Sequence, residues 1–144
     1  MSSTFNDANV INGTYGECWL DGEYMAQVTK LRAELTKNYD DVKRARSLVV
    51  GKKLTSIDTE GEVTLAKIDS TIAKTEADAL KEGKSLTHTI ISKLADPAAM
   101  GHERIALYGV QFEKATLADW ENGSLGEESY SFTFSDWEYL DAIE

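Results

Sequence analysis

The chain has 144 residues, a length that suits one compact domain or one domain with extended arms. Its 25 acidic residues exceed its 15 basic ones, giving a formal net charge of −10 at pH 7, and this balance argues against a protein whose main task is to hold nucleic acid. Hydrophobic residues make up 42% of the chain, enough to build a core, and the single cysteine excludes an intrachain disulfide or a multi-cysteine metal site.

The N-terminal segment carries neither a basic stretch nor an apolar one, so the sequence predicts no secretory signal. No run of about 18 apolar residues predicts a membrane span. We therefore expect a protein that is made in the cytoplasm and does not bind membranes. Residues 1–13 lack any periodicity and are expected to form a flexible N-terminal arm ahead of a single domain over residues 14–140.

A β-hairpin is predicted at the start of the domain. Asp21-Gly22 lies between two runs of β-forming residues, and this dipeptide favours a type I′ turn because both central positions need a positive φ. The second strand is expected to continue to Leu35. Its apolar residues change from even-numbered to odd-numbered positions near Thr29 and Lys30, which predicts a β-bulge there.

Residues 39–60 fit neither helical nor strand periodicity and are expected to form a long loop or arm. They are mainly polar and basic, with one apolar run at positions 48–50. A neighbouring subunit could bury this run; alternatively, the loop folds back over the core of its own domain. If a neighbour is the partner, the candidate contact residues are Lys43, Arg44, Arg46, Leu48, Val49, Val50, Lys52 and Lys53.

Charge is distributed unevenly along the chain. Positions 30–53 hold eight basic residues and three acidic ones, whereas positions 113–144 hold nine acidic residues and one lysine. Such blocks are commonly two solvated faces of opposite sign. They also suit a self-assembling protein, because a basic arm of one copy can meet an acidic face of the next and so orient the contact.

One helix is predicted. Residues 61–69 alternate like a strand and lead into residues 70–82, where Asp69 or Ser70 can cap the N-terminus and Gly83 can end the helix. Most side chains on the apolar face are small, so the helix is expected to lie on a sheet. The residues expected to share that face are Ala73, Ala77 and Leu80.

The C-terminal half is predicted to be β-structure. The expected strands cover residues 85–94, 104–115 and 128–136. The second of these strands has apolar residues on both faces, which is typical of a strand that is central or faces a partner. Leu117 and Trp120 could extend it.

The chain closes with an acidic end at residues 137–144, of which 141–144 is expected to lie outside the domain as an acidic tail. Together, the predicted elements give a mostly β fold: a β-sandwich or partly closed barrel of about six strands with one α-helix.

Residues that usually carry catalysis are sparse. His88 shares a strand face with Leu86 and Ile90 and is expected to be a packed sheet residue, while His102 lies alone in a loop. Cys18 is expected to be a buried hydrophobe rather than a reactive thiol. No phosphate-binding, dinucleotide-binding, nucleophile-elbow or calcium-loop motif occurs. The sequence therefore predicts no enzyme, no catalytic or metal-binding residue and no cofactor.

Two kinds of non-enzymatic function remain. A subunit of an assembly would cover its edge strands by continuing its sheet into the next copy. A monomeric β-sandwich module that binds carbohydrate or protein would instead need an exposed aromatic platform. In an assembly, the same aromatic side chains would lie at subunit contacts or cover one end of the sandwich; they are Trp120, Trp137 and Tyr139.

Three segments of this sequence resemble PBSX-type phage tail tube proteins. Residues 16–26 (GECWLDGEYMA) are similar to the hairpin of that family, residues 103–112 (ERIALYGVQF) to one of its strands, and residues 125–137 (LGEESYSFTFSDW) to its acidic closing strand. The resemblance spans residues 13–137. It implies a β-sandwich with one helix, related to the tube protein of type VI secretion.

The resemblance also implies a role. Such proteins form hexameric rings that stack into the inner tube of a contractile tail, with sheath, tape-measure and baseplate proteins as partners. In a phage the tube later passes DNA; in a phage-tail-like bacteriocin it does not. The protein would be made in the bacterial cytoplasm and become part of a virion tail or released particle, and a tube of the type VI kind is the alternative. Residues 39–60 depart from the glycine-rich stretch of the family, and we expect residues 43–53 to meet acidic residues of an adjacent ring.

Overall fold

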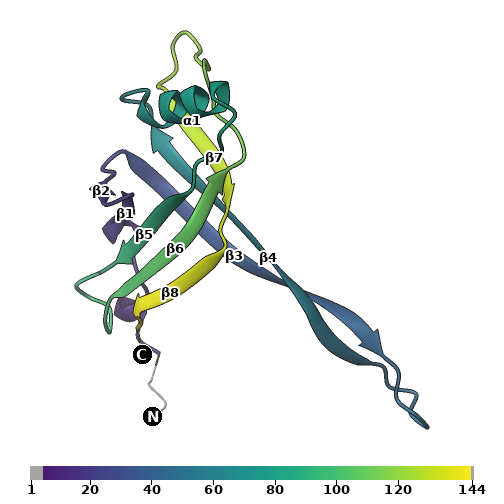
Figure 1. The fold of residues 1–144 in the computed structure, drawn as a ribbon. Helices are drawn as coiled ribbons and strands as arrows, with labels where there is room; N and C mark the ends of the chain where they lie inside the picture. The colour runs from purple at the N-terminus through teal and green to yellow at the C-terminus, as the bar shows by residue number, and fades with distance from the viewer. Residues whose placement is uncertain (1–4, 144) are drawn as a thin grey trace.

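The computed structural model of the protein describes residues 5–143 and shows a β-domain from which a long hairpin projects (Figure 1). Two short 3-10 turns, η1 (Asp7–Asn9) and η2 (Gly13–Tyr15), precede the first strand. The mostly β fold with one helix, predicted from the sequence, is confirmed. The strands and the helix are, in chain order, β1 (Gly16–Leu20), β2 (Glu23–Tyr24), β3 (Val28–Val42), β4 (Gly51–Ala66), α1 (Thr71–Lys81), β5 (His88–Leu94), β6 (Glu103–Phe112), β7 (Glu127–Thr133) and β8 (Asp136–Asp141).

The N-terminal arm predicted over residues 1–13 falls partly outside the described residues, which begin at position 5. Close to its end, the backbone N–H of Asn12 donates a hydrogen bond of 2.9 Å to the Oδ2 atom of Asp96. This bond attaches the chain before β1 to the loop that follows β5.

β6 is the central strand of the sheet. Neighbouring strands are antiparallel in the order β2-β1-β5-β6-β7-β4-β3, and β8 also pairs with β6. One edge of β6 serves two partners, because residues 104–108 pair with β8 and residues 111–112 pair with β7. Gly109 lies between these two stretches with a φ of +65°, and a Cβ atom there would lie 2.0 Å from the Oγ atom of Ser135. Glycine is therefore the residue that permits the change of partner.

The sheet does not close on itself. Its two end strands are β2 and β3. β1 and β3 are not neighbours in the strand order, and a groove of about 640 Å³ lies between β1 and the first residues of β3. This arrangement agrees with the predicted sandwich or partly closed barrel.

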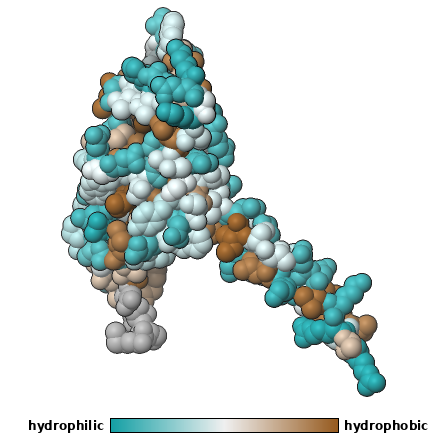
Figure 2. Space-filling view, in the orientation of Figure 1, coloured by the Kyte–Doolittle hydropathy of each residue, from teal (hydrophilic) through white to brown (hydrophobic). Residues whose placement is uncertain are grey.

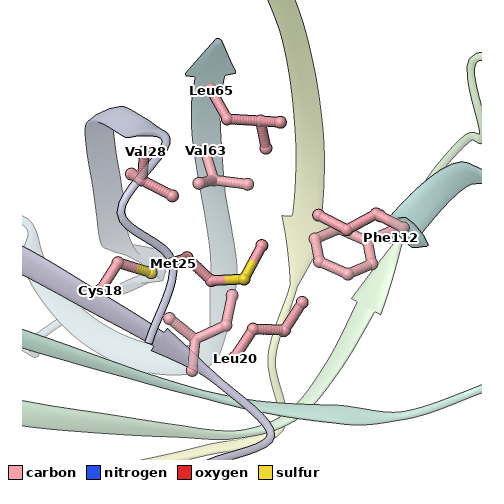
Figure 3. A pocket seen from close by; sticks show the side chains of 9 residues that line it. Cys18, Leu20, Met25, Val28, Val63, Leu65 and Phe112 are labelled. Carbon is pink, nitrogen blue, oxygen red and sulfur yellow. The ribbon is translucent and has the colours of Figure 1, made fainter. Parts of the chain in front are cut away.

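Aromatic side chains dominate the core. Tyr130 and Phe132 are fully buried, and the ring centroid of Phe112 lies 5.8 Å and 6.1 Å from theirs. Burial raises the pKa of the Cys18 thiol to about 11, which confirms the predicted buried hydrophobe. A cavity of about 10 Å³ remains in this core, roughly the room of one water molecule. The side chains labelled around it in Figure 3 are Cys18, Leu20, Met25, Val28, Val63, Leu65 and Phe112.

The predicted hairpin turn and bulge are both confirmed. Asp21 and Gly22 have φ values of +50° and +86°, and the pairing of β3 with β4 shifts between Val28 and Lys30. One continuous second strand after the turn was also predicted, and this is wrong. The chain turns at residues 25–27, so β2 pairs with β1 whereas β3 pairs with β4.

Helix α1 confirms the predicted helix, and Gly83 follows it with a φ of +72°. Ala73 is buried as expected. The prediction that Leu80 lies on the same buried face is wrong, because Leu80 is 62% exposed. Glu76 takes a buried position instead, since its carboxylate bonds to His88 beneath the helix.

Residues 39–60 were expected to form a long loop or arm. They do project as an arm (Figure 1), but the expected lack of strand structure is wrong, because only the turn at 43–50 lies outside β3 and β4. A register shift between the two strands places Leu54 and Ile57 on one face although they are three positions apart. The apolar residues of this strand therefore do not alternate regularly, and the sequence pattern did not reveal the strand. At the acidic end of the chain, β8 pairs along the edge of β6 as far as Asp141, the first residue of the tail expected at 141–144, and residue 144 lies outside the described residues.

Candidate assembly interface

A two-stranded ribbon projects from the domain (Figure 1). Over residues 34–60, β3 and β4 pair only with each other, because β4 meets β7 only from Gly61 onward and β3 is the end strand of the sheet. We call residues 34–60 the arm. An isolated two-stranded hairpin is at best marginally stable in water. We therefore expect a bound partner to stabilise the arm.

One face of the arm carries its large apolar side chains, with Lys37 among them opposite Ile57. Tyr39 lies opposite Leu54 in the ladder, and Leu35 and Ile57 lie in phase with them. All four side chains are between 44% and 50% exposed. Figure 2 shows hydrophobic residues recurring along the arm between hydrophilic ones. We call Leu35, Tyr39, Leu54 and Ile57 the apolar face.

The opposite face of the arm is polar and satisfies its own hydrogen bonds. The Nδ2 atom of Asn38 donates to the Oδ2 atom of Asp58 at 2.9 Å and to the Oγ atom of Ser56 at 3.1 Å. Nearer the body, Arg32 bridges Glu34 and Glu60, each at 3.2 Å. This face suits contact with water, so the apolar face is the one that a partner would cover.

The apolar face continues the core face of the domain. Along β4, Gly61, Val63 and Leu65 follow in phase with Ile57, and Val63 and Leu65 are each only 4% exposed. At Gly61 the ring of Phe132 takes the space of a side chain, since a Cβ atom would lie 2.4 Å from it. Full burial of an aliphatic side chain is worth roughly 1.5–3 kcal/mol, so covering four half-exposed side chains would stabilise a contact by several kcal/mol.

The tip of the arm, residues 43–50, is both basic and apolar. Leu48 is fully exposed, and Val49 and Val50 are 66% and 47% exposed. The tip carries three basic side chains that form no ion pair with any residue in the range 5–143: Lys43, Arg44 and Arg46.

The structure brings together all eight residues named from the sequence as contact candidates. Six lie in the tip, and Lys52 and Lys53 open the adjoining strand. Lys52 pairs with Asp41 across the ribbon, and Lys53 lies opposite Asp40, so these two lysines face acids of their own arm. Of the five basic residues among these eight, the three that do not face an acid of the arm are therefore those in the tip.

Sequence reasoning missed the apolar face. The four residues were visible as apolar positions, but Leu54 and Ile57 break the alternation that reveals a strand. Allowing one bulge between them would have aligned both with Leu35 and Tyr39 of the preceding strand.

A second exposed apolar group lies on the loop between β6 and β7, residues 113–126. Leu117 is 77% exposed, Trp120 84% and Leu125 98%. The prediction that Leu117 and Trp120 extend the strand is wrong, because β6 ends at Phe112. The loop also holds four charged side chains without an ion pair to any residue in 5–143, one basic and three acidic: Lys114, Glu113, Asp119 and Glu121.

The aromatic platform of a binding module is not assembled. Trp120 lies on the 113–126 loop, whereas Trp137 and Tyr139 lie on β8 near the other end of the body (Figure 1). Trp137 packs edge-to-face on Phe134, with ring centroids 6.4 Å apart. The three aromatic side chains therefore do not form one surface.

His88 is packed in the sheet as predicted, with a side chain only 10% exposed, but both ring nitrogens contact carboxylates. Nδ1 lies 2.6 Å from Oδ2 of Asp21, and Nε2 lies 2.5 Å from Oε1 of Glu76. Burial lowers the pKa of His88, but the bonds to Asp21 and Glu76 outweigh it and raise the pKa above its ordinary value. The cluster joins the β1–β2 turn, β5 and α1.

Among residues 5–143, no three His, Cys, Asp or Glu side chains come together in a way that could hold a metal ion. The described part of the chain also contains no helix both long and apolar enough to pass through a bilayer. The candidate functional features of the described residues are therefore three exposed surfaces: the apolar face of the arm, the basic tip of the arm and the loop at residues 113–126.

Comparison with known proteins identifies related sequences. A family model described as "phage tail tube protein" matches residues 3–141. The XkdM protein of the phage-like element PBSX of Bacillus subtilis (strain 168) is 33% identical over 132 residues, covering 90% of each chain. The uncharacterized protein YqbM of the same organism is 33% identical over 139 residues, covering 94% of each chain.

Solved structures share the fold. A chain of the tube-terminating cap of the anti-feeding prophage superposes with a TM-score of 0.73 at 8% identity, covering 99% of this chain and 95% of that one. A chain from the sheath–tube complex of an extracellular contractile injection system gives 0.73 at 8% identity, covering 98% and 100%. A Bacillus subtilis protein gives 0.55 at 30% identity, covering 92% and 97%.

Proposed function

Because this chain belongs to the phage tail tube protein family, we propose that it forms hexameric rings that stack into the inner tube of a contractile tail or phage-tail-like particle. Membership of this family supports a role as a tail tube subunit, which is a structural protein. Its fold is also that of chains in injection-system particles. The ring, its sixfold symmetry and the kind of particle are the proposal.

The observation that carries the proposal is the uncovered apolar face of the arm. This face continues the core face of the domain outward along the arm. Within residues 5–143 of one copy, nothing covers its four side chains fully, and they stay about half exposed: Leu35, Tyr39, Leu54 and Ile57. Exposed apolar surface of this kind marks a contact with another protein. A second copy is the simplest partner, because a sheet that does not close and ends in free strand edges can be continued by an identical chain.

The polar face of the arm suits the wall of a lumen. With Arg32 at its root, this face carries two bases, Arg32 and Lys53, against four acids: Glu34, Asp40, Asp58 and Glu60. The whole chain has a net charge of −10. Like charges repel, so an acidic wall would let DNA or another polyanion pass without binding. We assign this face to the lumen and the apolar face to the contact between copies.

The proposed partners follow from this role. The chain would assemble with itself, with a surrounding sheath, and with tape-measure and baseplate proteins, and DNA would pass only if the particle is a phage. The structural neighbours come from a sheath–tube complex and a tube-terminating cap, which supports such an assembly. We propose synthesis in the bacterial cytoplasm, followed by incorporation into a virion tail or released particle.

Electron microscopy tests the proposal. The purified protein, concentrated and in the presence of a kosmotropic salt such as ammonium sulfate, which strengthens apolar burial, is expected to give hollow tubes with sixfold end views in negative stain. A protein that stays monomeric by light scattering at every concentration and salt would contradict both the ring and the tube.

A further inference from the structure

We infer that the tip of the arm (43–50) of one copy binds the loop at residues 113–126 of a second copy in the adjacent ring. This inference rests on the proposed tube and adds to it the identity of the surface that receives the tip. The evidence is complementary charge, matching apolar exposure and the placement of the two segments in the molecule.

The two segments are complementary in charge. Lys43, Arg44 and Arg46 in the tip form no ion pair with any residue in 5–143. On the loop, the same holds over the same range for Glu113, Asp119 and Glu121 and for one lysine, Lys114, so three acids against one base leave the loop with a net charge of −2. Opposite charges across a contact fix its orientation and suppress wrong pairings.

Both segments also expose large apolar side chains beside these charges. Leu48 in the tip is fully exposed, and Trp120 and Leu125 in the loop are 84% and 98% exposed. An exposed aromatic side chain with aliphatic neighbours is the usual centre of a protein contact, and charged residues form the rim. The tip and the loop therefore have the composition of two halves of one interface.

The acidic strand β8 is a weaker acceptor, because its acids are already bonded. Glu138 accepts a hydrogen bond of 2.9 Å from the hydroxyl of Tyr108, and Asp141 lies 3.3 Å from Nε2 of His102 and 3.9 Å from Arg104. Trp137 is also partly covered by Phe134. Binding of the tip there would break existing contacts, whereas binding to the loop would not.

The placement of the two segments favours an open-ended assembly. In Figure 1 the loop lies beside α1 at one end of the body, and the arm tip lies at the opposite end of the molecule. A contact between two different surfaces, head to tail, does not close within one pair of copies and can be repeated without limit. This is the geometry that stacked rings require.

Charge reversal tests the inference. A tip variant (Lys43→Glu, Arg44→Glu, Arg46→Glu) and a loop variant (Glu113→Lys, Asp119→Lys, Glu121→Lys) should each lose the tubes that sediment in an ultracentrifuge, by about tenfold or more. A chain carrying all six changes should recover tubes, because the charges are complementary again. Circular dichroism of each variant checks that the domain is folded.

The outcomes separate the two proposals. If the combined variant remains without tubes while the wild type forms them, or if the loop variant alone forms normal tubes, the loop is not the acceptor and the inference fails. If the wild type itself forms neither rings nor tubes, the proposed function fails instead.

Cross-linking provides a second measurement that depends less on folding. Ser47→Cys with Asn122→Cys in one chain should give disulfide-linked multimers when assembled tubes are oxidised with oxidised glutathione. The matched control combines Ser47→Cys with Tyr139→Cys on β8 and should stay unlinked. Buried Cys18 is kept in both, since the raised pKa of its thiol makes it unreactive. Linking through Tyr139→Cys but not Asn122→Cys would overturn the inference.

Discussion

The Nε2 atom of His88 lies 2.5 Å from the Oε1 atom of Glu76, and this contact joins the only α-helix among residues 5–143 to the sheet. On the other side of the ring, Asp21 contacts Nδ1 of His88 and also accepts a hydrogen bond of 2.9 Å from the backbone N–H of Thr89. One imidazole therefore ties together three elements, and two carboxylates favour its charged form.

Stability should depend on pH through His88. The folded pKa is raised, so the contribution of this cluster is fully present below the ordinary pKa of 6.5 and is lost as the pH rises through the folded pKa. Thermal unfolding of the wild type, measured from about pH 6 to pH 9, should show a falling midpoint. His88→Gln should lack this part of the pH dependence; an identical slope in both proteins would contradict the prediction.

Glu76→Gln should destabilise the domain by about 1.5–3 kcal/mol, because it removes the charge from a buried hydrogen bond to His88. Chemical denaturation with urea measures the change. Glu82→Gln, at the exposed end of the same helix, is the matched control and should stay within about 0.5 kcal/mol of the wild type. Equal effects of the two changes would show that the contact with His88 adds nothing.

Gly61→Ala should destabilise the domain by about 1–3 kcal/mol, because its Cβ atom would lie 2.4 Å from the ring of Phe132 and 2.7 Å from the carbonyl oxygen of Arg32. Gly13→Ala introduces the same methyl group where no heavy atom lies within 4 Å, and its free energy of unfolding should be nearly unchanged. The comparison uses the same denaturation measurement. A Gly61→Ala protein as stable as the wild type would mean that Phe132 can move aside at little cost.

The two faces of the arm should differ in their effect on assembly. Leu54→Asn with Ile57→Asn should lower the fraction of protein that sediments as tubes by about tenfold, because it removes apolar surface from the contact. Thr36→Asn with Ser56→Asn places the same side chain on the polar face and should leave tube formation close to that of the wild type. The reverse result would exchange the roles assigned to the two faces.

Much of the fold could be predicted from local chemistry. The Asp21-Gly22 turn needs positive φ values that few dipeptides accept, and Gly83 ends the helix for the same reason. The alternation of Tyr130, Phe132 and Phe134 identifies a strand because one of its faces is fully buried. These signals depend on near neighbours in the chain.

The arm could not be predicted in this way, because its pattern depends on a register between two strands. The bulge near Tyr39 interrupts the period of β4, and no layer of the same copy covers Leu54 or Ile57. The contact between Glu76 and His88 was hidden for a related reason: a buried carboxylate is explained only by its partner, 12 positions away. Both features need the three-dimensional arrangement.

The root of the arm is anchored at Thr59, whose hydroxyl donates to the carbonyl oxygen of Phe134 at 2.6 Å and accepts from its backbone N–H at 3.1 Å. Beyond this point, the hydrogen bonds described for residues 34–58 stay within the ribbon itself or at its root. Substitutions between residues 34 and 58 should therefore leave the hydrogen bonds of the body in place. If copies join through the arm as proposed, its sequence can vary to suit a neighbour without altering the core of the domain.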